Sequence, residues 1–335
     1  MQSIISDNNT MKRILLFSFC LLSFFLQTVW GQKGALTEVR QVVERVTGQS
    51  DLPVSFVLKL DKGANYFQYR VDNGVLKIEG SNPVALCRGF YDFVKSNRAG
   101  LYSWSGSNIC FPQQLVDGME KRIVSPFEHH YLFNVCTYGY SMPYWDWERW
   151  EKEIDWMVLH GINLPLAITG TDVVWYQVLN RLGYSKEEIN SFIAGPAFQA
   201  WWLMNNLEGW GGPNPDSWYK QQADLQKKIV KRMCEYGIEP VLPGYSGMVP
   251  HDAKEKLQLN VQNPGLWCAY NRPAFLQPTD PRFGEIATIF YEEMNKLYGK
   301  ANYYSMDPFH EGGSTKGVDL QKSVEEIMKQ MKKNN

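Results

Sequence analysis

Three polar loops after residue 126 each follow a short apolar segment that is typical of a β-strand. They cover residues 134–140, 169–172 and 307–313, and the last contains Glu311 followed by two glycines. In parallel α/β folds the reacting groups lie on loops at the carboxyl ends of the strands. A carboxyl group on such a loop can act as a general acid, because a pocket can raise its pKa. The pattern favours acid–base chemistry at Glu311; a solvated loop glutamate is the alternative.

Tryptophan is concentrated in the same part of the chain, since ten of the 12 tryptophans lie between Trp145 and Trp267. The flat face of an indole ring packs against the C–H side of a sugar, and its N–H group can bond a hydroxyl. Trp147, Trp150 and Trp156 fall at helical spacing and are expected to pack in the core. We expect about three of the ten to contact a ligand, and the surplus favours a carbohydrate pocket.

Other chemistries find little support in the residue pattern. The five histidines include no H-E-x-x-H spacing and no glycine-rich phosphate loop is present, so we expect neither a metal nor another cofactor. Ser246 lies in a Gly-Tyr-Ser-Gly segment and lacks the G-x-S-x-G arrangement of a hydrolase nucleophile. With 34 Lys and Arg against 35 Asp and Glu, the net charge of −1 provides no field to attract nucleic acid.

The polar loops are placed by an alternation of short apolar strands and longer helices after Pro126. Such an alternation predicts a parallel sheet covered by helices. Four strands are half of those in a (β/α)8 barrel, so the pattern fits both an open α/β sheet and the first half of a barrel. The predicted strands are 131–136, 162–168, 238–242 and 302–306; the predicted helices are 145–159, an insertion around 179–202, 217–236 and one with Asp280 as N-cap and Pro281 as its first residue.

Residues 33–122 predict a small α+β domain that shows no sign of chemistry. Apolar residues at helical spacing between Leu36 and Val46 indicate a first helix. The triplet 72–74, Asp-Asn-Gly, favours a hairpin turn because these residue types tolerate a positive φ. The predicted strands are 53–60, 66–71 and 75–78, and a second helix covers 84–95.

The first 31 residues have the pattern of a secretory signal peptide. A basic stretch at 11–13 precedes the apolar run 14–26, and Trp30-Gly31 offers a cleavage site. Residues 1–10 would be an upstream extension. The apolar run is shorter than a membrane-spanning helix, so a permanent anchor is the weaker interpretation. We expect an exported protein with no stable membrane span after signal cleavage, in the bacterial periplasm, on the outer surface or outside the cell.

Five cysteines remain after such a cleavage, at positions 87, 110, 136, 234 and 268. An odd number cannot all pair within one chain, and the spacing contains no C-x-x-C pattern of a zinc or thioredoxin-like site. We expect buried, small apolar residues with one disulfide at most. The mature sequence has no Asn-x-Ser/Thr acceptor, which favours a bacterial exported protein over a lysosomal glycoprotein.

Several long, tryptophan-rich segments resemble the alpha-N-acetylglucosaminidases of glycoside hydrolase family 89. The resemblance extends from about residue 35 to about residue 320, so that chance similarity is a poor explanation. The segments are NVCT at 134–137, YWDWERWEKEIDWM at 144–157, HGINLPLA at 160–167, GPAFQAW at 195–201, PVLP at 240–243 and DPFHE at 307–311.

The resemblance implies a small N-terminal domain, a (β/α)8 TIM-type catalytic barrel and a helical C-terminal domain. The implied reaction is the exo-hydrolysis of terminal α-linked N-acetylglucosamine from a glycan, with retention of configuration. Glu311 matches the acid/base of the family, and His310 would orient it or contact the sugar. The other positions that match the family's sugar pocket are Asn134, Cys136, Tyr140, Trp201 and Trp267, with Asn134 as a hydrogen-bonding residue and the tryptophans as stacking residues.

The family's nucleophile has no counterpart in this sequence. A retaining glycosidase needs two carboxyl groups, and the family's second one is a glutamate on a later barrel strand. Asp172 and Asp307 follow comparable strands, but neither matches that position. We therefore predict a small domain at 33–122 and a truncated, partial barrel at 126–335, which binds a glycan and is inactive by itself. A non-catalytic carbohydrate-binding protein derived from the enzyme is the alternative.

Overall fold

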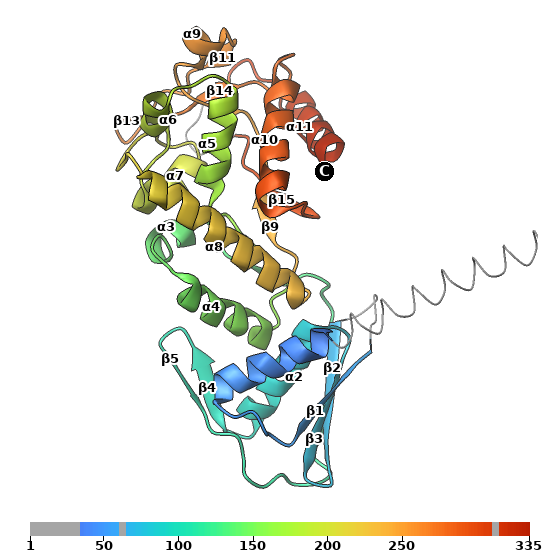
Figure 1. The fold of residues 1–335 in the computed structure, drawn as a ribbon. Coiled ribbons are helices and arrows are strands. Elements are labelled where there is room, and N and C mark those ends of the chain that lie inside the picture. Colours follow the sequence, from blue (N-terminus) through green and yellow to red (C-terminus); the bar gives the residue numbers. More distant parts are fainter. Residues whose placement is uncertain (1–33, 60–64, 310–314) are drawn as a thin grey trace, which may run out of the picture. The chain divides into compact units, whose positions relative to one another are not determined.

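The computed structural model describes residues 34–59, 65–309 and 315–335 (Figure 1). The predicted signal peptide lies outside these ranges. Within them, no helix is both long and apolar enough to cross a membrane.

The five cysteines after the predicted leader are all free, so the described residues form no disulfide. Cys87 is buried and Cys136 is half-buried, but the other three are exposed. The prediction of buried cysteines is therefore wrong for Cys110, Cys234 and Cys268. Their side chains lie on the surface of their elements, which the cysteine spacing alone does not reveal.

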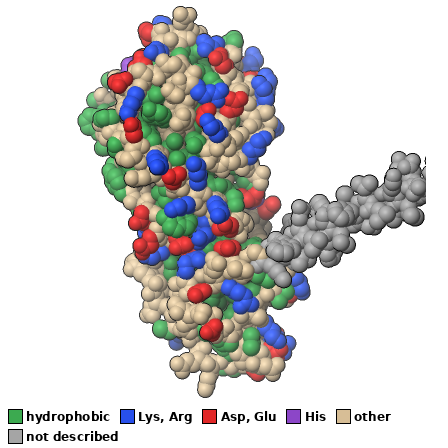
Figure 2. Space-filling model, viewed as in Figure 1, with side chains coloured by type: hydrophobic (Ala, Val, Ile, Leu, Met, Phe, Trp, Pro, Cys, Tyr) green, Lys and Arg blue, Asp and Glu red, His purple; other side chains and the backbone are tan. Residues whose placement is uncertain are grey.

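The chain divides into two compact units. The first consists of the described residues up to Glu128 together with 155–161, and the second of 129–154 and 162–335. Helix α4 (Trp147–His160) contributes to both, because its second half counts with the first unit. Positive and negative side chains are interspersed over the face shown in Figure 2, in keeping with the nearly balanced charge of the sequence.

The first unit is built on a four-stranded sheet with the order β1-β3-β2-β6. β1 and β3 are parallel and the other neighbours are antiparallel. Helix α2 packs on β2 and β3 through an almost entirely buried face. The elements are a helix at 34–47, β1 (Val54–Leu58), β2 (Asn65–Asp72), β3 (Val75–Gly80), α2 (Pro83–Ser96), the hairpin of β4 (Gly100–Ser103) and β5 (Gly106–Ile109), and β6 (Glu120–Ser125).

Local chemistry explains why these elements form where the sequence predicts them. Asn73 and Gly74 both have positive φ, as a two-residue hairpin turn requires, and Asp72 pairs with Val75 across the turn. The Asn82 side chain caps α2 by accepting a hydrogen bond from the backbone N–H of Ala85. The predicted hairpin and both predicted helices of this unit are confirmed.

The second unit contains four short parallel strands in the order β7-β8-β9-β15. They are β7 (Tyr131–Leu132), β8 (Leu164–Pro165), β9 (Val241–Pro243) and β15 (Tyr303–Ser305). β7 pairs with β8 and β15 pairs with β9, both parallel, and a parallel bridge from Leu166 to Val241 joins the two pairs. All four predicted strands therefore exist, although each is shorter than predicted.

Helices connect and cover these strands, with α10 and α11 side by side in Figure 1. The core is strongly aromatic: Trp150, Trp202 and Tyr245 are almost completely buried. Several small strands and one short helix fill the long connection between β9 and α10. The helices are α3 (Val135–Ser141), α4, α5 (Thr171–Arg181), α6 (Lys186–Phe192), η1 (Pro196–Phe198), α7 (Gln199–Leu203), α8 (Asp216–Glu235), α9 (Ala253–Leu257), α10 (Phe283–Tyr298) and α11 (Leu320–Asn334); the small strands are β10 (Met248–Val249), β11 (Val261–Gln262), β12 (Leu266–Trp267), β13 (Tyr270–Asn271) and β14 (Ala274–Leu276).

Side-chain-to-backbone hydrogen bonds explain two of the boundaries that differ from the prediction. The predicted strand 131–136 ends early, because the Asn134 side chain accepts the backbone N–H of Thr137 and starts α3. Helix α10 begins at Phe283 instead of Pro281, because the Asp280 carboxylate accepts the N–H of Arg282 in a turn that precedes the helix.

Candidate active site

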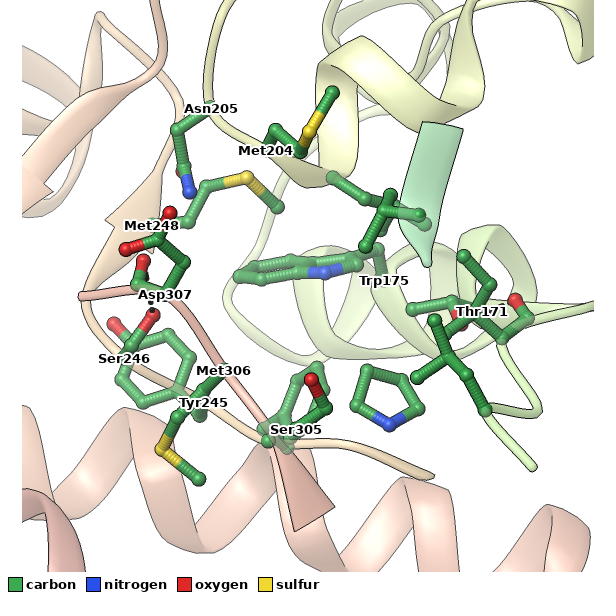
Figure 3. A pocket seen from close by; sticks show the side chains of 17 residues that line it. Thr171, Trp175, Met204, Asn205, Tyr245, Ser246, Met248, Ser305, Met306 and Asp307 are labelled. Carbon is green, nitrogen blue, oxygen red and sulfur yellow. Dashed lines mark hydrogen bonds between the residues drawn. The ribbon is translucent and has the colours of Figure 1, made fainter. Parts of the chain in front are cut away.

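A cavity of about 120 Å³ opens at the carboxyl ends of β8, β9 and β15. This is the end of a parallel α/β sheet at which ligands bind, as the sequence pattern predicts. The cavity is lined by the loops after these strands and by α3, α5, α7, β10 and α10 (Figure 3). Its lining residues are Val135, Leu166, Ile168, Thr171, Trp175, Leu203, Met204, Asn205, Pro243, Gly244, Tyr245, Ser246, Met248, Phe290, Ser305, Met306 and Asp307.

The wall of the cavity combines a large aromatic surface with a few polar groups. The Trp175 ring extends across the cavity, with Asn205, Ser246 and Asp307 on one side (Figure 3). The Ser246 hydroxyl donates to the backbone oxygen of Asp307 at 3.5 Å, which joins the loop after β9 to the loop after β15. An apolar cavity with a few convergent polar groups is the usual composition of a small-molecule site.

Among the residues that the structure describes, Asp307 is the one that brings a carboxylate to the lining of the cavity. It is exposed, and its Oδ1 accepts the backbone N–H of Phe309 at 3.3 Å. The two residues predicted to carry the acid chemistry and its support, Glu311 and His310, lie outside the described residues. Their predicted roles therefore stay predictions, on a loop whose first residues reach the cavity.

Asp172 does not face the cavity, although its place after β8 resembles that of Asp307 after β15. It is the second residue of α5 and is 1% exposed. Its Oδ2 accepts hydrogen bonds from Gln199 Nε2 at 2.8 Å and from Trp218 Nε1 at 2.7 Å. Burial raises the pKa of this carboxyl, and the hydrogen bonds oppose that shift. Asp172 is thus a structural group inside the protein.

Asn134 is the N-cap residue of α3 and Cys136 lies in its first turn, on either side of Val135, which lines the cavity. The Asn134 Oδ1 atom is used as the helix cap, with Thr137 as donor, so its exposed amide NH2 group is the end that can serve a ligand. Cys136 Sγ lies 3.9 Å from the Met204 sulfur, and Met204 lines the cavity.

The rings of Tyr140 and Trp201 are in contact. Their ring centroids are 5.2 Å apart in an edge-on arrangement, and Tyr140 is 76% exposed. Gly139 allows this contact, because a Cβ atom there would lie 2.7 Å from the Ala200 Cβ and 2.8 Å from the Trp201 ring. Trp201 belongs to α7, the helix that ends at the cavity wall.

Trp267 is placed by a different element, the β12–β13 hairpin, where it pairs with Tyr270. The Tyr270 ring lies 4.9 Å from that of Trp210. None of these three residues lines the cavity. None of the described sugar-pocket candidates, Asn134, Cys136, Tyr140, Trp201 and Trp267, lines the cavity itself. Cys136, Tyr140 and Trp201 belong to α3 and α7, two helices that each contribute a lining residue, and Trp267 lies on a separate hairpin.

Of the tryptophans expected in the core, only Trp150 is fully buried. Trp147 lies beneath the guanidinium of Arg232 at 5.2 Å, and Trp156 stacks on the imidazole of His160 with ring centroids 4.0 Å apart. Both are half-buried, so the core prediction is wrong for these two. These two positions of α4 face the polar side chains of Arg232 and His160.

A buried acid near the cavity has no signal in the sequence. The Glu208 side chain is 7% exposed and binds the imidazole of His251, whose backbone N–H also donates to it at 3.3 Å. Burial raises the pKa of Glu208 to about 7, although the bonds from His251 lower it. The two residues are 43 positions apart, and no motif relates them. Among the described residues, no cluster of histidine, cysteine and acidic side chains could hold a metal ion.

Comparison with known families finds two matches that together account for most of the chain. The family described as "Alpha-N-acetylglucosaminidase (NAGLU) tim-barrel domain" matches residues 130–335, and its "N-terminal domain" matches 37–115. The barrel match decides between the open sheet and the barrel in favour of the barrel. The second unit therefore contains four of the parallel strands of a TIM-type barrel, preceded by a small α+β unit.

Individual relatives give the same result. Human alpha-N-acetylglucosaminidase is 38% identical over 286 residues, which are 82% of this chain and 38% of the human protein. A family 89 glycoside hydrolase from Clostridium perfringens, bound to 2-acetamido-1,2-dideoxynojirmycin, superposes with a TM-score of 0.88 at 37% identity. A variant of that enzyme holds its substrate, GlcNAc-alpha-1,4-galactose, and has the same score. The match covers 92% of this chain and 36% of the clostridial chain.

More distant structures share only the fold. The N-acetyl-beta-hexosaminidase of Streptomyces plicatus superposes with a TM-score of 0.51 at 12% identity. The chain thus spans between 36% and 38% of the length of the relatives with substantial identity.

Proposed function

The chain belongs to the alpha-N-acetylglucosaminidase family, glycoside hydrolase family 89. We propose that it binds glycans in its cavity and removes terminal α-linked N-acetylglucosamine from them. One observation carries the proposal: a family barrel domain matched over 130–335 has a cavity at the carboxyl ends of its strands, where glycosidases of this fold bind sugar. The clostridial relative with the same fold holds GlcNAc-alpha-1,4-galactose, a sugar of this class.

The proposed reaction proceeds with retention of configuration, and Glu311 is the acid/base. A retaining glycosidase protonates the leaving oxygen with one carboxylic acid while a second carboxylate, about 5 to 5.5 Å away, attacks the anomeric carbon. The first group then acts as a base towards the incoming water. Support for Glu311 in the first role comes from its position four residues after Asp307, a residue that lines the cavity.

The proposed sugar contacts divide by chemistry. Asn134 would donate its amide N–H groups to a sugar oxygen, because its carbonyl oxygen caps α3. Trp201 and Trp267 would present flat faces to the C–H side of the ring, with Tyr140 supporting Trp201. Cys136 would contact the sugar beside Met204, and His310 would orient Glu311 or bind the sugar. These six assignments are proposals that mutation can test one by one.

The second carboxylate is not assigned to either described candidate. Asp172 is buried and accepts hydrogen bonds from Gln199 and Trp218, so its carboxyl group cannot reach a sugar in the cavity. Asp307 lines the cavity but does not match the family's nucleophile position. We therefore expect the 335 residues by themselves to bind the sugar without hydrolysing it. Hydrolysis by these residues alone would overturn this part of the proposal.

The decisive experiment follows the disaccharide GlcNAc-α-1,4-galactose by proton NMR with the protein as the cell produces it. We expect N-acetylglucosamine to appear first as the α-anomer. Glu311→Gln should lower kcat/KM by about 10²- to 10⁴-fold, the usual contribution of a general acid. Glu285→Gln is the matched control, because that glutamate is an exposed residue of α10. A β-anomer as the first product, or no binding at millimolar disaccharide, would contradict the proposal.

Export of the protein is a further part of the proposal, supported by the basic and apolar pattern of residues 11–26. Processing should remove residues 1–31. Mass spectrometry of the protein recovered from the cell envelope and the medium would give the new N-terminus. A cytoplasmic protein that keeps these residues would contradict export.

A further inference from the structure

Asp172 is a buried carboxylate that the proposed chemistry does not use. It lies in the first turn of α5, between Thr171 and Trp175, two residues of the same helix that line the cavity. Its side chain is directed away from solvent, with 1% exposure. Burial of a carboxyl group lowers the stability of the folded protein unless hydrogen bonds satisfy its oxygens. Asp172 therefore needs well-placed hydrogen-bond donors.

Neutral donors from three helices satisfy this carboxylate. Gln199 of α7 and Trp218 of α8 donate to Oδ2 at 2.8 Å and 2.7 Å, and the backbone N–H of Val173 in α5 donates to Oδ1 at 3.0 Å. No salt bridge reaches Asp172 from the part of the chain that the structure describes. The first turn of a helix also favours a negative charge. The carboxylate thus joins α5, α7 and α8 through directional hydrogen bonds.

Of these three helices, α7 depends most on the connection. It is five residues long, and its N-cap residue, Phe198, makes no side-chain hydrogen bond to the helix. So short a helix has little stability of its own. Gln199 is the first residue of α7, and Trp201 lies two positions further along the helix. Leu203 ends the helix, and Met204 and Asn205 continue from it along the wall of the cavity.

We propose that Asp172 is a positioning residue, which holds α7 through Gln199 so that Trp201 and the Met204–Asn205 wall keep the geometry needed to bind the sugar. This role rests on the proposed function of the cavity. The carboxylate does not touch the sugar. Its effect passes along the chain from Gln199 to Trp201, a residue that also contacts Tyr140 on the opposite helix α3.

Two single substitutions separate this role from a general loss of stability. Gln199→Met removes the donor on α7, and Trp218→Phe removes the donor on α8; each leaves Asp172 with one side-chain partner fewer. The first readout is hydrogen exchange of the backbone amides of 199–206, measured by mass spectrometry on the full chain. We expect exchange to accelerate about tenfold or more in Gln199→Met, as loss of a hydrogen bond to a charged group predicts, and to stay near wild type in Trp218→Phe.

The second readout is the dissociation constant of GlcNAc-α-1,4-galactose, followed by tryptophan fluorescence. It should rise about tenfold in Gln199→Met and change little in Trp218→Phe. Asp172→Asn keeps one oxygen that can accept from Gln199 and Trp218 but turns its NH2 group towards the Val173 N–H, so its dissociation constant should lie between those of wild type and Gln199→Met. Asp172→Leu should resemble Gln199→Met.

The outcomes distinguish the two proposals. If wild type does not bind the disaccharide, the proposed function fails, and the exchange of 199–206 still tests the link from Asp172 to α7. If Gln199→Met leaves this exchange unchanged, or if both single variants alter it equally, the positioning role is wrong. Should Asp172→Leu fail to fold, the two conservative variants at 199 and 218 still give the answer.

Discussion

Two carboxyl groups near the cavity, Asp172 and Glu208, are buried but satisfied in different ways. Neutral donors bind the Asp172 carboxyl group, whereas Glu208 is bound by His251, an imidazole that is 59% exposed. Burial is the largest influence on both, and it raises the pKa of each. Burial raises the pKa of Glu208 to about 7, so Glu208 should contribute to the response of this region to pH near neutrality.

The free energy of unfolding should therefore depend on pH through Glu208. Its pKa rises from the ordinary 4.5 to about 7 on folding, so the folded protein binds more protons between these values. The contribution of protonated Glu208 to the free energy of unfolding is complete below pH 4.5 and is lost as the pH rises through about 7. We expect a loss of up to about 3 kcal/mol over this interval, measured by urea unfolding at about pH 4.5, 6 and 8.

Glu208→Gln provides the test, because an amide does not titrate and should flatten this part of the pH profile. Glu255→Gln removes the same charge from an exposed position of α9 and should keep the slope. An unchanged profile in Glu208→Gln would show that another group is responsible.

The close approach of α3 to α7 is the central feature at the scale of elements. The two helices touch through Gly139, whose position leaves no room for a side chain beside Ala200 and Trp201. In the same region Tyr140 of α3 contacts Trp201 of α7, and Cys136 contacts Met204, the residue that follows α7. One glycine therefore sets how far apart two proposed sugar-binding elements can lie.

Gly139→Ala should push these helices apart. The added methyl group would overlap Ala200 and Trp201, and overpacking of this kind costs about 1 to 3 kcal/mol. We expect a lower free energy of unfolding in urea together with weaker disaccharide binding. Gly34→Ala is the control, since a Cβ at this helical position meets nothing within 4 Å. Wild-type stability in Gly139→Ala would contradict the close contact.

Elements with strong local signals could be predicted from the sequence, and elements without them could not. The 20-residue α8 has a long apolar stripe and appears within one residue of its prediction. The parallel strands are only two or three residues long, because pairing and not propensity decides where each ends. The predicted strand over 131–136 ends at Leu132 for this reason: the Asn134 cap competes with pairing and starts a helix.

At the scale of the whole molecule, the first unit recruits residues from the middle of the chain. Arg45 binds Asp155 with two hydrogen bonds of 2.8 Å across 110 positions, and the Asp155 side chain is 2% exposed. The ring of Tyr91 lies 4.9 Å from that of His160 in the same unit. A small N-terminal domain is expected from the sequence, but its completion by the end of α4 is not.

Arg45→Leu should destabilise the first unit by about 3 kcal/mol, because it removes the two-point partner of a buried carboxylate. Lys77→Met is the control in the same unit: Lys77 binds Asp72 at 2.7 Å, but both side chains are exposed, so the cost should be about 0 to 1 kcal/mol. Thermal and urea unfolding would measure both. Equal losses in the two variants would contradict a special role of the Arg45–Asp155 pair.

The α/β pattern, the hairpin at 72–74 and the candidate loops could be predicted from local sequence, because turns, caps and hydrophobic periods depend on residues a few positions apart. The family could be predicted from long matching segments. Which side chains share a site became clear only from the folded structure. It buried Asp172 and left Asp307 at the cavity, although both follow parallel strands. It also joined Glu208 to His251 over 43 positions. Burial and pairing depend on which distant segments pack together, and no local pattern encodes that.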